Sequence, residues 1–420
     1  MEKINRSFYT IIVIFVFLFY LGATTSFQQL NLAGLESEYG LVAYWKFDEG
    51  VGNVAYDSSG NGNDGTIYGA IWVDGIEGKA LQFNGIDDYI EIPSSPSLNL
   101  IDSQITILAW VKTNYTKRGT IVCNWYYDKS VSPHVNERSY VCTINDDGKA
   151  DFGLSGDGEV GVFLKSSESI NKDKWTHLAF VSNGSIMAIY VDGKLTDTKE
   201  APSTIYQSNR EVFIGVWNAK EAAGGEFSEF FKGAIDRVKV YSRALSSQEI
   251  LQDYFEVVDT GKIEGTVVDE INGSRLSGLK ISANGYWNTT NLNGEYTLTL
   301  PIGTYTVTAL KIGYKQKSIP NIIVQKNQTT TVNFALEPII GNIVYVATDG
   351  TGDFNCDGKD DQIEINEAIS YINSIRGGIV HLKQGTYIIR DSIILCSNLT
   401  FEGEGVDKTA IKIQEGSTKE

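Results

Sequence analysis

Alternating apolar and polar residues run through most of the chain and predict β-strands joined by tight turns. The segment 189–195 has the sequence IYVDGKL, whose central Asp192-Gly193 is typical of a two-residue hairpin loop. Ser246 and Glu249 have the spacing of a capping box ahead of a short helix. Short strands otherwise fill residues 40–255, and this pattern predicts a β-sandwich or barrel.

Residues 261–337 show the same alternation in three short runs, each with one apolar and one polar face. Such runs describe half-buried antiparallel strands, and a turn at 301–303 joins two of them. A small second β-sandwich is therefore expected. The apolar positions are Tyr296, Leu298 and Leu300, then Tyr305, Val307 and Ala309, then Val332, Phe334 and Leu336.

The third segment, residues 342–420, combines one helix with short strands. An amphipathic pattern over 362–374 predicts the helix. A helix ahead of short, evenly spaced strands predicts the entrance to a parallel β-helix. Because little follows the opening coil, we expect a fragment of a longer protein, and packing of this end against another partner is the alternative. The expected strands are 343–346, 379–382, 387–389, 393–395, 399–401 and 411–413.

Composition fits about three folded domains in an acidic protein. At 420 residues the chain is too long for one ordinary core, and 21% charged with 42% hydrophobic residues exclude wholesale disorder. The formal net charge of -17 argues against a nucleic-acid partner, since phosphate binding requires a concentrated basic surface. An acidic surface also attracts divalent cations.

The N-terminus, residues 1–26, predicts export. Lys3 and Arg6 precede an apolar run over 9–21 and the small residues of 22–26, which is the order found in secretory signals. The apolar run is shorter than the roughly 20 residues that span a bilayer. An uncleaved N-terminal anchor is the alternative, and it would be the only membrane contact. The rest of the chain is expected to be secreted or displayed at the cell surface.

Four cysteines in an exported chain favour oxidation. Cys123 and Cys142 fall in neighbouring predicted strands, so a disulfide bond between them is expected. Cys356 and Cys396 form the second possible pair. Free buried thiols are the alternative, because spacing alone does not fix connectivity.

Residues 40–255 carry a series of short motifs. They are GLVAYWKFDE at 40–49, DSSGNGNDG at 57–65, LQFNG at 81–85 with DYI at 88–90, ILAWV at 107–111, WTHLA at 175–179 and FKGAID at 231–236. With these motifs in this order, the segment resembles the LamG-like jelly-roll family, within the concanavalin A-like lectin/glucanase fold. The resemblance implies a jelly-roll β-sandwich that displays its loops to a glycan or a protein.

Two further resemblances cover the rest of the chain. Residues 261–337 are similar to the carboxypeptidase regulatory-like domain, a small transthyretin-like sandwich that acts as a spacer in many exported proteins. Residues 342–420 resemble the start of the pectin lyase-like fold, a right-handed parallel β-helix with a capping helix. The motifs are GTVVD at 265–269, NGEY at 293–296, LPIGTY at 300–305 and GY at 313–314, then GGIVHL at 377–382, GTY at 385–387 and FEGEG at 401–405.

One loop, residues 353–364, satisfies a calcium-binding pattern. Oxygen-bearing side chains stand at loop positions 1, 3, 5 and 12, and glycine stands at position 6. A hard cation takes six to eight oxygens, and the glycine permits the turn that gathers them. The alternative is that Asp360 or Asp361 caps the following helix. The expected ligands are Asp353, Asn355, Asp357, the backbone carbonyl of Lys359, and Glu364.

A second calcium site is implied by the jelly-roll resemblance alone. It involves the loop 57–65, with Asp57, Asn61 and Asp236 as ligands. The alternative is an ordinary turn, in which Asn, Asp and Gly supply positive φ angles and local hydrogen bonds. Structural Ca²⁺ is thus the one cofactor expected.

Flat aromatic rings beside carboxylates or amides are what sugar recognition uses. Most tryptophans of a sandwich belong to its core, which is the alternative, and Trp45, Trp110 and Trp175 are expected to be core residues. The candidate ligand-binding residues are Trp125, Tyr126, Tyr127, Asp128, Trp217 and Asn218.

Catalytic residues are not evident, and the sequence favours binding over catalysis. Jelly-roll glucanases need two carboxylates flanking the scissile bond, commonly in one strand, and none has that spacing here. His134, His177 and His381 are isolated, without metal-ligand spacing. The preferred function is recognition of an extracellular glycan or surface protein. The alternatives are the N-terminal part of a polysaccharide lyase or hydrolase whose catalytic β-helix lies beyond residue 420, and a surface-layer or adhesin stalk.

Overall fold

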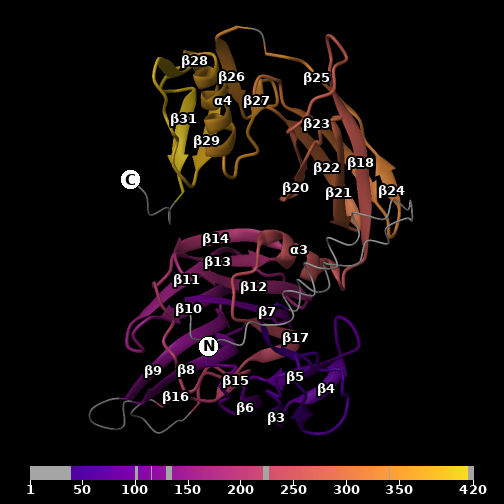
Figure 1. Ribbon diagram of the computed structural model, residues 1–420. Helices are drawn as coiled ribbons and strands as arrows, with labels where there is room; N and C mark the ends of the chain where they lie inside the picture. Colours follow the sequence, from indigo (N-terminus) through magenta and orange to yellow (C-terminus); the bar gives the residue numbers. More distant parts are fainter. Residues whose placement is uncertain are drawn as a thin grey trace, which may run out of the picture.

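The computed structural model describes residues 39–99, 103–114, 116–128, 135–220, 227–339 and 341–414. They form three successive regions that are mainly β (Figure 1). The predicted export segment, residues 1–26, lies outside the described residues. Within them, no helix is long and apolar enough to span a membrane.

The first region is a sandwich of two sheets with a core between them, and all of their strands pair antiparallel except β16, which pairs parallel to β8. The eight-stranded sheet has the order β14-β13-β12-β7-β17-β5-β4, with β1 beside β17. The nine-stranded sheet has the order β11-β10-β9-β8-β15-β6-β3-β2, with β16 beside β8. Trp45, Phe83, Phe152 and Phe180 are fully buried between the sheets, which confirms the jelly-roll prediction and the placement of Trp45.

The strands of the jelly roll are as follows. They are β1 (Leu41–Trp45), β2 (Val54–Ala55), β3 (Gly65–Tyr68), β4 (Ile71–Asp74), β5 (Lys79–Asn84), β6 (Tyr89–Ile92), β7 (Gln104–Lys112), β8 (Gly119–Asp128), β9 (Val135–Ile144), β10 (Lys149–Ser155), β11 (Gly161–Ser169), β12 (Thr176–Asn183), β13 (Ile186–Val191), β14 (Lys194–Glu200), β15 (Val212–Ile214), β16 (Ala219–Lys220) and β17 (Lys232–Tyr241).

Two local features of this region, a hairpin turn and a helix start, agree with the sequence-based predictions. Asp192 and Gly193 have φ angles of 50° and 75° between β13 and β14, as a two-residue hairpin loop requires. Helix α3 (Ser247–Phe255) closes the region and begins with a complete capping box of Ser246 and Glu249. The predicted turn and the predicted helix start are both confirmed.

The second region is a small sandwich of two four-stranded sheets. Every residue of its predicted apolar runs is buried, so the alternation identified the strand faces correctly. One sheet joins β18 (Thr260–Asp269), β21 (Glu295–Pro301), β24 (Thr329–Thr331) and β25 (Phe334–Leu336). The other joins β19 (Lys280–Ala283), β20 (Tyr286–Thr289), β22 (Gly303–Leu310) and β23 (Lys317–Val324).

The third region pairs its strands in parallel around helix α4 (Gln362–Ser374), whose range matches the prediction. One sheet has the order β27-β26-β28-β30, and β29 pairs with β31. Membership of the pectin lyase-like fold stays a prediction. The strands are β26 (Ile343–Ala347), β27 (Phe354–Asn355), β28 (Gly378–Leu382), β29 (Gly385–Ile389), β30 (Leu399–Gly403) and β31 (Thr409–Ile413).

The strand predicted at 393–395 is wrong. Its backbone bonds to a side chain of α4 instead of to a neighbouring strand. The Asn366 amide nitrogen donates to the Ser392 carbonyl (2.9 Å), and its oxygen accepts from the Ile394 N–H (2.7 Å). The side-chain amide of Asn366 thereby takes the place of a neighbouring strand as the hydrogen-bond partner of this segment. The apolar residues at 393–395 gave no indication of this partner.

Candidate functional site

The outer face of the nine-stranded sheet carries an aromatic cluster that is separate from the core between the sheets. Cys123 and Trp125 of β8 belong to this cluster, whereas Ile121 and Val122 of the same strand belong to the core between the sheets. Irregularities at 120–122 and 124–125 interrupt the alternation of β8. Val141 and Phe213 from neighbouring strands join the aromatic cluster. The outer face of the sheet is thus built from large apolar groups.

This aromatic cluster is closely packed. The Trp125 and Trp217 rings meet edge to face with centroids 6.3 Å apart, and the centroids of Trp125 and Phe163 are 5.5 Å apart. Gly161 makes room for Trp125, because a Cβ there would come within 2.7 Å of the indole. Trp125 is only 4% exposed, whereas Phe163 is 37% exposed and Trp217 is half-buried.

Arginines lie against these rings. The guanidinium carbon of Arg118 lies 5.0 Å from the Trp217 ring centroid, and that of Arg138 lies 4.2 Å from the Tyr127 centroid. Guanidinium groups against aromatic faces place several N–H donors beside flat apolar surfaces. A ligand that offers both C–H faces and hydroxyl groups fits such a surface.

Two carboxyl groups flank Arg118. Its Nη1 lies 3.3 Å from Oε1 of Glu229, and its Nη2 lies 3.6 Å from Oδ2 of Asp151. Burial raises the pKa of Glu229 to about 7, although the Arg118 charge opposes the rise. Burial likewise raises the pKa of Asp151, again against the attraction of Arg118. Each group holds a proton more readily than an exposed carboxylate does.

Three polar atoms of this cluster are buried without a hydrogen-bond partner. They are Oε2 of Glu229, Oδ1 of Asp151 and Nε1 of Trp217. Buried polar atoms are normally paired, and unpaired ones mark a place where water or a ligand completes the network. We name Arg118, Glu229, Asp151 and Trp217 the Arg118 cluster.

Sequence reasoning missed three members of the Arg118 cluster. Glu229 precedes β17, Asp151 lies on β10, and Arg118 precedes β8, so no spacing along the chain unites them. A search for two acids in one strand could not find a pair that the sheet assembles from distant segments.

The predicted ligand-binding residues lie together at one end of the sheet. Trp217 is half-buried and belongs to the Arg118 cluster. Tyr126 and Tyr127 are half-buried beneath arginines, with Arg210 4.3 Å from the Tyr126 centroid. The other three, which are Trp125, Asp128 and Asn218, are buried.

The loop 57–65 uses its polar groups to hold the turn. Oδ1 of Asp57 accepts from the backbone N–H groups of Tyr44 (2.9 Å) and Ser59 (2.8 Å), and its Oδ2 accepts from the Asn63 N–H (2.9 Å). The Asn61 amide donates to the Val42 carbonyl (2.9 Å). Oδ2 of Asp236 accepts from the Ile76 N–H (2.9 Å).

The loop 353–364 also engages its backbone. Asp353 accepts from the Tyr345 N–H (2.9 Å), and Asn355 accepts from the Gly352 N–H (2.8 Å). Asp357 accepts from the N–H of Lys359 (3.1 Å). These three residues therefore already stabilise the loop.

A different set of side chains in the segment 353–364 lies close together. Ligand atoms of Cys356, Asp361 and Glu364 lie within 4.8 Å of one another. Burial, with the charges of neighbouring acids, raises the pKa of Glu364 to about 7. Asp361 stands at the N-cap of α4 but makes no capping bond, because its oxygens accept from Gly358 and Ile388. Calcium binding by either loop stays a prediction.

The cysteine prediction is wrong, because all four cysteines are free. In the β8–β9 register Val122 pairs with Cys142 and Cys123 pairs with Val141. Cys142 therefore faces the core between the sheets and Cys123 faces the outer cluster, so their sulfurs lie on opposite faces. Cys356 and Cys396 instead lie near backbone carbonyls of Asp361 and Ile369, each at 3.9 Å.

The tryptophans and histidines discussed from the sequence lie in different environments. Trp110 is buried, but in the contact between the first two regions, where it stacks on Tyr254 with centroids 5.6 Å apart. Trp175 is half-buried and packs against the same cluster of residues, so it lies at the margin of a core and not inside it. His177 is buried, and Nδ1 of His381 lies 2.9 Å from Glu402. His134 lies outside the described residues.

Comparison with known families agrees with this architecture. Residues 84–251 match the model of the concanavalin A-like lectin/glucanases superfamily. Residues 262–337 match the carboxypeptidase regulatory-like domain. The first region is therefore a concanavalin A-like lectin domain, and the second is a carboxypeptidase regulatory-like domain.

Individual relatives match only parts of the chain. Carboxypeptidase D of Mus musculus is 35% identical over 113 residues, which cover 25% of this chain and 8% of that protein. Carboxypeptidase D of Homo sapiens is 31% identical over 106 residues, with the same coverage of 25% and 8%. The chain thus spans about 8% of the length of the curated relatives it matches.

Solved structures match parts of the chain at low sequence identity and low TM-score. Domain 4 of AbnA, a GH43 extracellular arabinanase from Geobacillus stearothermophilus in complex with arabinotriose, is 22% identical with a TM-score of 0.38, covering 50% of this chain and 97% of that one. The binding domain of Paraclostridial Mosquitocidal Protein 1 is 15% identical with a TM-score of 0.43, covering 69% and 76%. The binding domain of Botulinum neurotoxin DC in complex with rat synaptotagmin II is 14% identical with a TM-score of 0.41, covering 67% and 73%.

Proposed function

We propose that this chain is an exported recognition protein whose concanavalin A-like domain binds an extracellular glycan on the outer face of its nine-stranded sheet. The Arg118 cluster carries the proposal, because it combines an aromatic ring, a planar guanidinium and two carboxyl groups at one place. Sugar rings offer C–H faces to aromatics and hydroxyl groups to charged acceptors.

The other domains fit a spacing role in this proposal. The carboxypeptidase regulatory-like domain contacts the jelly roll, since the Tyr286 hydroxyl donates to the Asp192 carbonyl (3.1 Å). We also propose that the third region, residues 342–420, is the start of a pectin lyase-like β-helix, and its parallel strand pairing is the support for this. The N-terminal pattern of 1–26 supports secretion or display at the cell surface.

A glycan array probed with the whole chain tests the function. We expect binding to a limited set of glycans, and we expect Trp217→Ala to weaken it at least about tenfold, since a central aromatic carries much of such binding. Trp287→Ala is the matched control, because Trp287 lies in the second region, is 55% exposed and has Lys280 at 5.8 Å from its ring.

Either of two results would contradict the proposal. One is the absence of any glycan bound by the folded chain. The other is equal loss of binding in Trp217→Ala and Trp287→Ala. If the chain captures a cell-surface protein that has been completely deglycosylated by enzymes, the same face of the sheet is a protein-binding site instead.

A further inference from the structure

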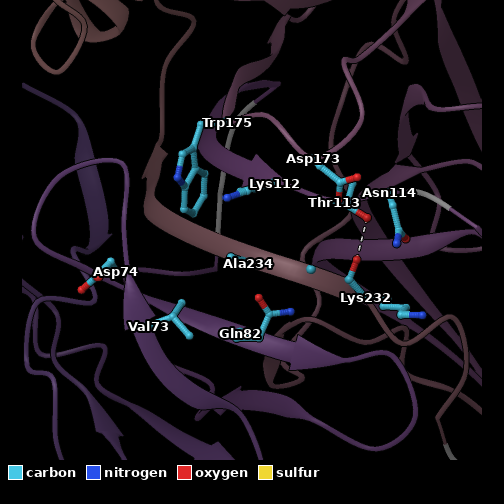
Figure 2. A pocket seen from close by; sticks show the side chains of 11 residues that line it. Val73, Asp74, Gln82, Lys112, Thr113, Asn114, Asp173, Trp175, Lys232 and Ala234 are labelled. Carbon is cyan, nitrogen blue, oxygen red and sulfur yellow. Dashed lines mark hydrogen bonds between the residues drawn. The ribbon is translucent and has the colours of Figure 1, made fainter.

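A hollow lies on the opposite side of the jelly roll, on the outer face of the eight-stranded sheet. Its volume is about 240 Å³, and residues of β4, β5, β7 and β17 line it together with the segment before β12 (Figure 2). Pockets for drug-sized ligands start near ~300 Å³, so this one suits a single small ring.

Strand register explains the hollow. Ala234 on β17 pairs with Gln82 on β5 and with Lys112 on β7, so a methyl group stands between two long polar side chains. Trp175 immediately precedes Thr176, which pairs with Val111, and this places the indole beside the Lys112 position. Figure 2 shows the indole on one side of the β17 ribbon and Gln82 on the other.

The lining places two lysines beside two acids in an acidic protein. Lys112 and Lys232 both line the hollow, and neither forms an ion pair within the part of the chain that the structure describes. Asp74 at the rim is neutralised by Lys79, with Nζ 2.8 Å from Oδ1. Asp173 is the second acid of the lining, so the lining itself is formally neutral, and Lys79 beside it brings the formal charge around the hollow to +1 on a chain of formal net charge -17.

From these observations we infer that the hollow is a second binding site, which takes one acidic sugar unit of the uronic acid class. The indole of Trp175 offers a flat face for the C–H side of the ring. The Gln82 amide and the Asp173 carboxylate serve hydroxyl groups, and Lys112 serves the sugar carboxylate through a charge-assisted hydrogen bond.

This site is independent of the proposed function. The Arg118 cluster belongs to the outer face of the nine-stranded sheet, whereas Ala234 and Lys112 belong to the other sheet of the sandwich. Loss of one site therefore leaves the other in place, and the two can be tested separately in the same protein.

Titration of the ¹⁵N-labelled whole chain with sodium glucuronate and sodium galacturonate tests the inference, with uncharged methyl glucoside as the comparison probe. We expect saturable shifts at the amides of Lys112, Gly233 and Ala234 at millimolar concentrations of at least one uronate. Lys112→Gln should weaken that binding about tenfold, the value of one charge-assisted hydrogen bond. Ala234→Leu, which fills the hollow, should abolish it.

Two variants serve as controls. Lys174→Gln removes a neighbouring exposed lysine that does not line the hollow, and it should bind like the wild type. Trp217→Ala should also bind the uronate normally, which separates this site from the Arg118 cluster. The inference is overturned by equal affinity for methyl glucoside, by unchanged binding in folded Lys112→Gln, or by no uronate binding at millimolar concentrations.

Discussion

The guanidinium carbon of Arg118 lies 5.0 Å from the Trp217 ring centroid, while the same guanidinium pairs with Glu229 and Asp151. One planar side chain thereby fixes both an aromatic face and two hydrogen-bonding carboxyl groups. A planar cation is required for this double role, because stacking and pairing use different directions of the guanidinium.

Replacing Arg118 by lysine keeps the positive charge and removes the planar guanidinium group. We expect Arg118→Lys to weaken glycan binding about tenfold while the melting temperature changes little, since a lysine pairs with one carboxylate at a time. Isothermal titration with the best array glycan measures the effect. Arg390→Lys, which alters the Arg390–Asp360 pair of the third region, is the control, and equal losses in both variants would argue against the role of Arg118.

Free thiols should persist in the folded protein. Burial raises the pKa of Cys123 to about 12, and burial also raises the pKa of Cys142 and of Cys356. Thiolates are the reactive form, so these three cysteines should resist a thiol reagent in the native state, whereas all four of the chain should react after unfolding. Fewer than four reactive thiols in unfolded, unreduced protein would reveal a disulfide bond.

Asp236 should make stability depend on pH. Burial raises its pKa from 3.8 to about 7, although a hydrogen bond from Ile76 opposes the rise, and Oδ1 has no partner. The folded state therefore favours the protonated form, so its stability is full below about pH 4 and falls as the pH rises through about 7.

The variant Asp236→Asn removes that loss. We expect it to stabilise the protein by roughly 2 kcal/mol at pH 8 and to have little effect at pH 4, as measured by urea unfolding at both pH values. Asp146→Asn changes an exposed residue and should do nothing at either pH. If the free energy of unfolding of the wild type rises relative to that of Asp236→Asn between pH 4 and pH 8, the role given to Asp236 is refuted.

Asp253 is held between His177 and Lys239. Burial alone would raise its pKa, but the hydrogen bond from His177 at 3.1 Å and the Lys239 charge hold the pKa well below its usual range. This contribution to stability is therefore present above about pH 4 and is lost as the pH falls below it.

Removing Asp253 alone leaves Lys239 buried without its closest partner. We expect Asp253→Asn to cost about 3–5 kcal/mol in urea unfolding at pH 7, and the double variant Asp253→Leu with Lys239→Met to cost less. Glu77→Gln, which breaks the more exposed pair with Arg237, should change stability by less than about 1 kcal/mol. A loss in Asp253→Asn no larger than in Glu77→Gln would contradict this assignment.

Much of the fold was predictable because local patterns determine it. The positive φ angles of Asp192-Gly193, the capping box at Ser246 and the periodicity of 362–374 each depend on neighbouring residues only. The alternation in 296–309 identified buried faces for the same reason.

Features that depend on register or on distant segments were not predictable. Whether Cys123 faces Cys142 is decided by a one-residue offset between β8 and β9, and no local signal encodes it. The Arg118 cluster unites residues 118, 151, 217 and 229, which only the assembled sheet brings together. The partial exposure of Trp175 at the margin of a core was not predictable either, because its motif does not show that Ala234 leaves a hollow nearby.

The most direct test of glycan recognition follows the indole N–H signals of the ¹⁵N-labelled chain during titration with the best array glycan. The account predicts that the Trp217 signal shifts and saturates with the binding isotherm. The Trp45 signal should stay fixed, because its Nε1 donates to the Asn63 carbonyl (2.8 Å) inside the core. A saturating glycan that leaves the Trp217 signal unmoved would contradict the account.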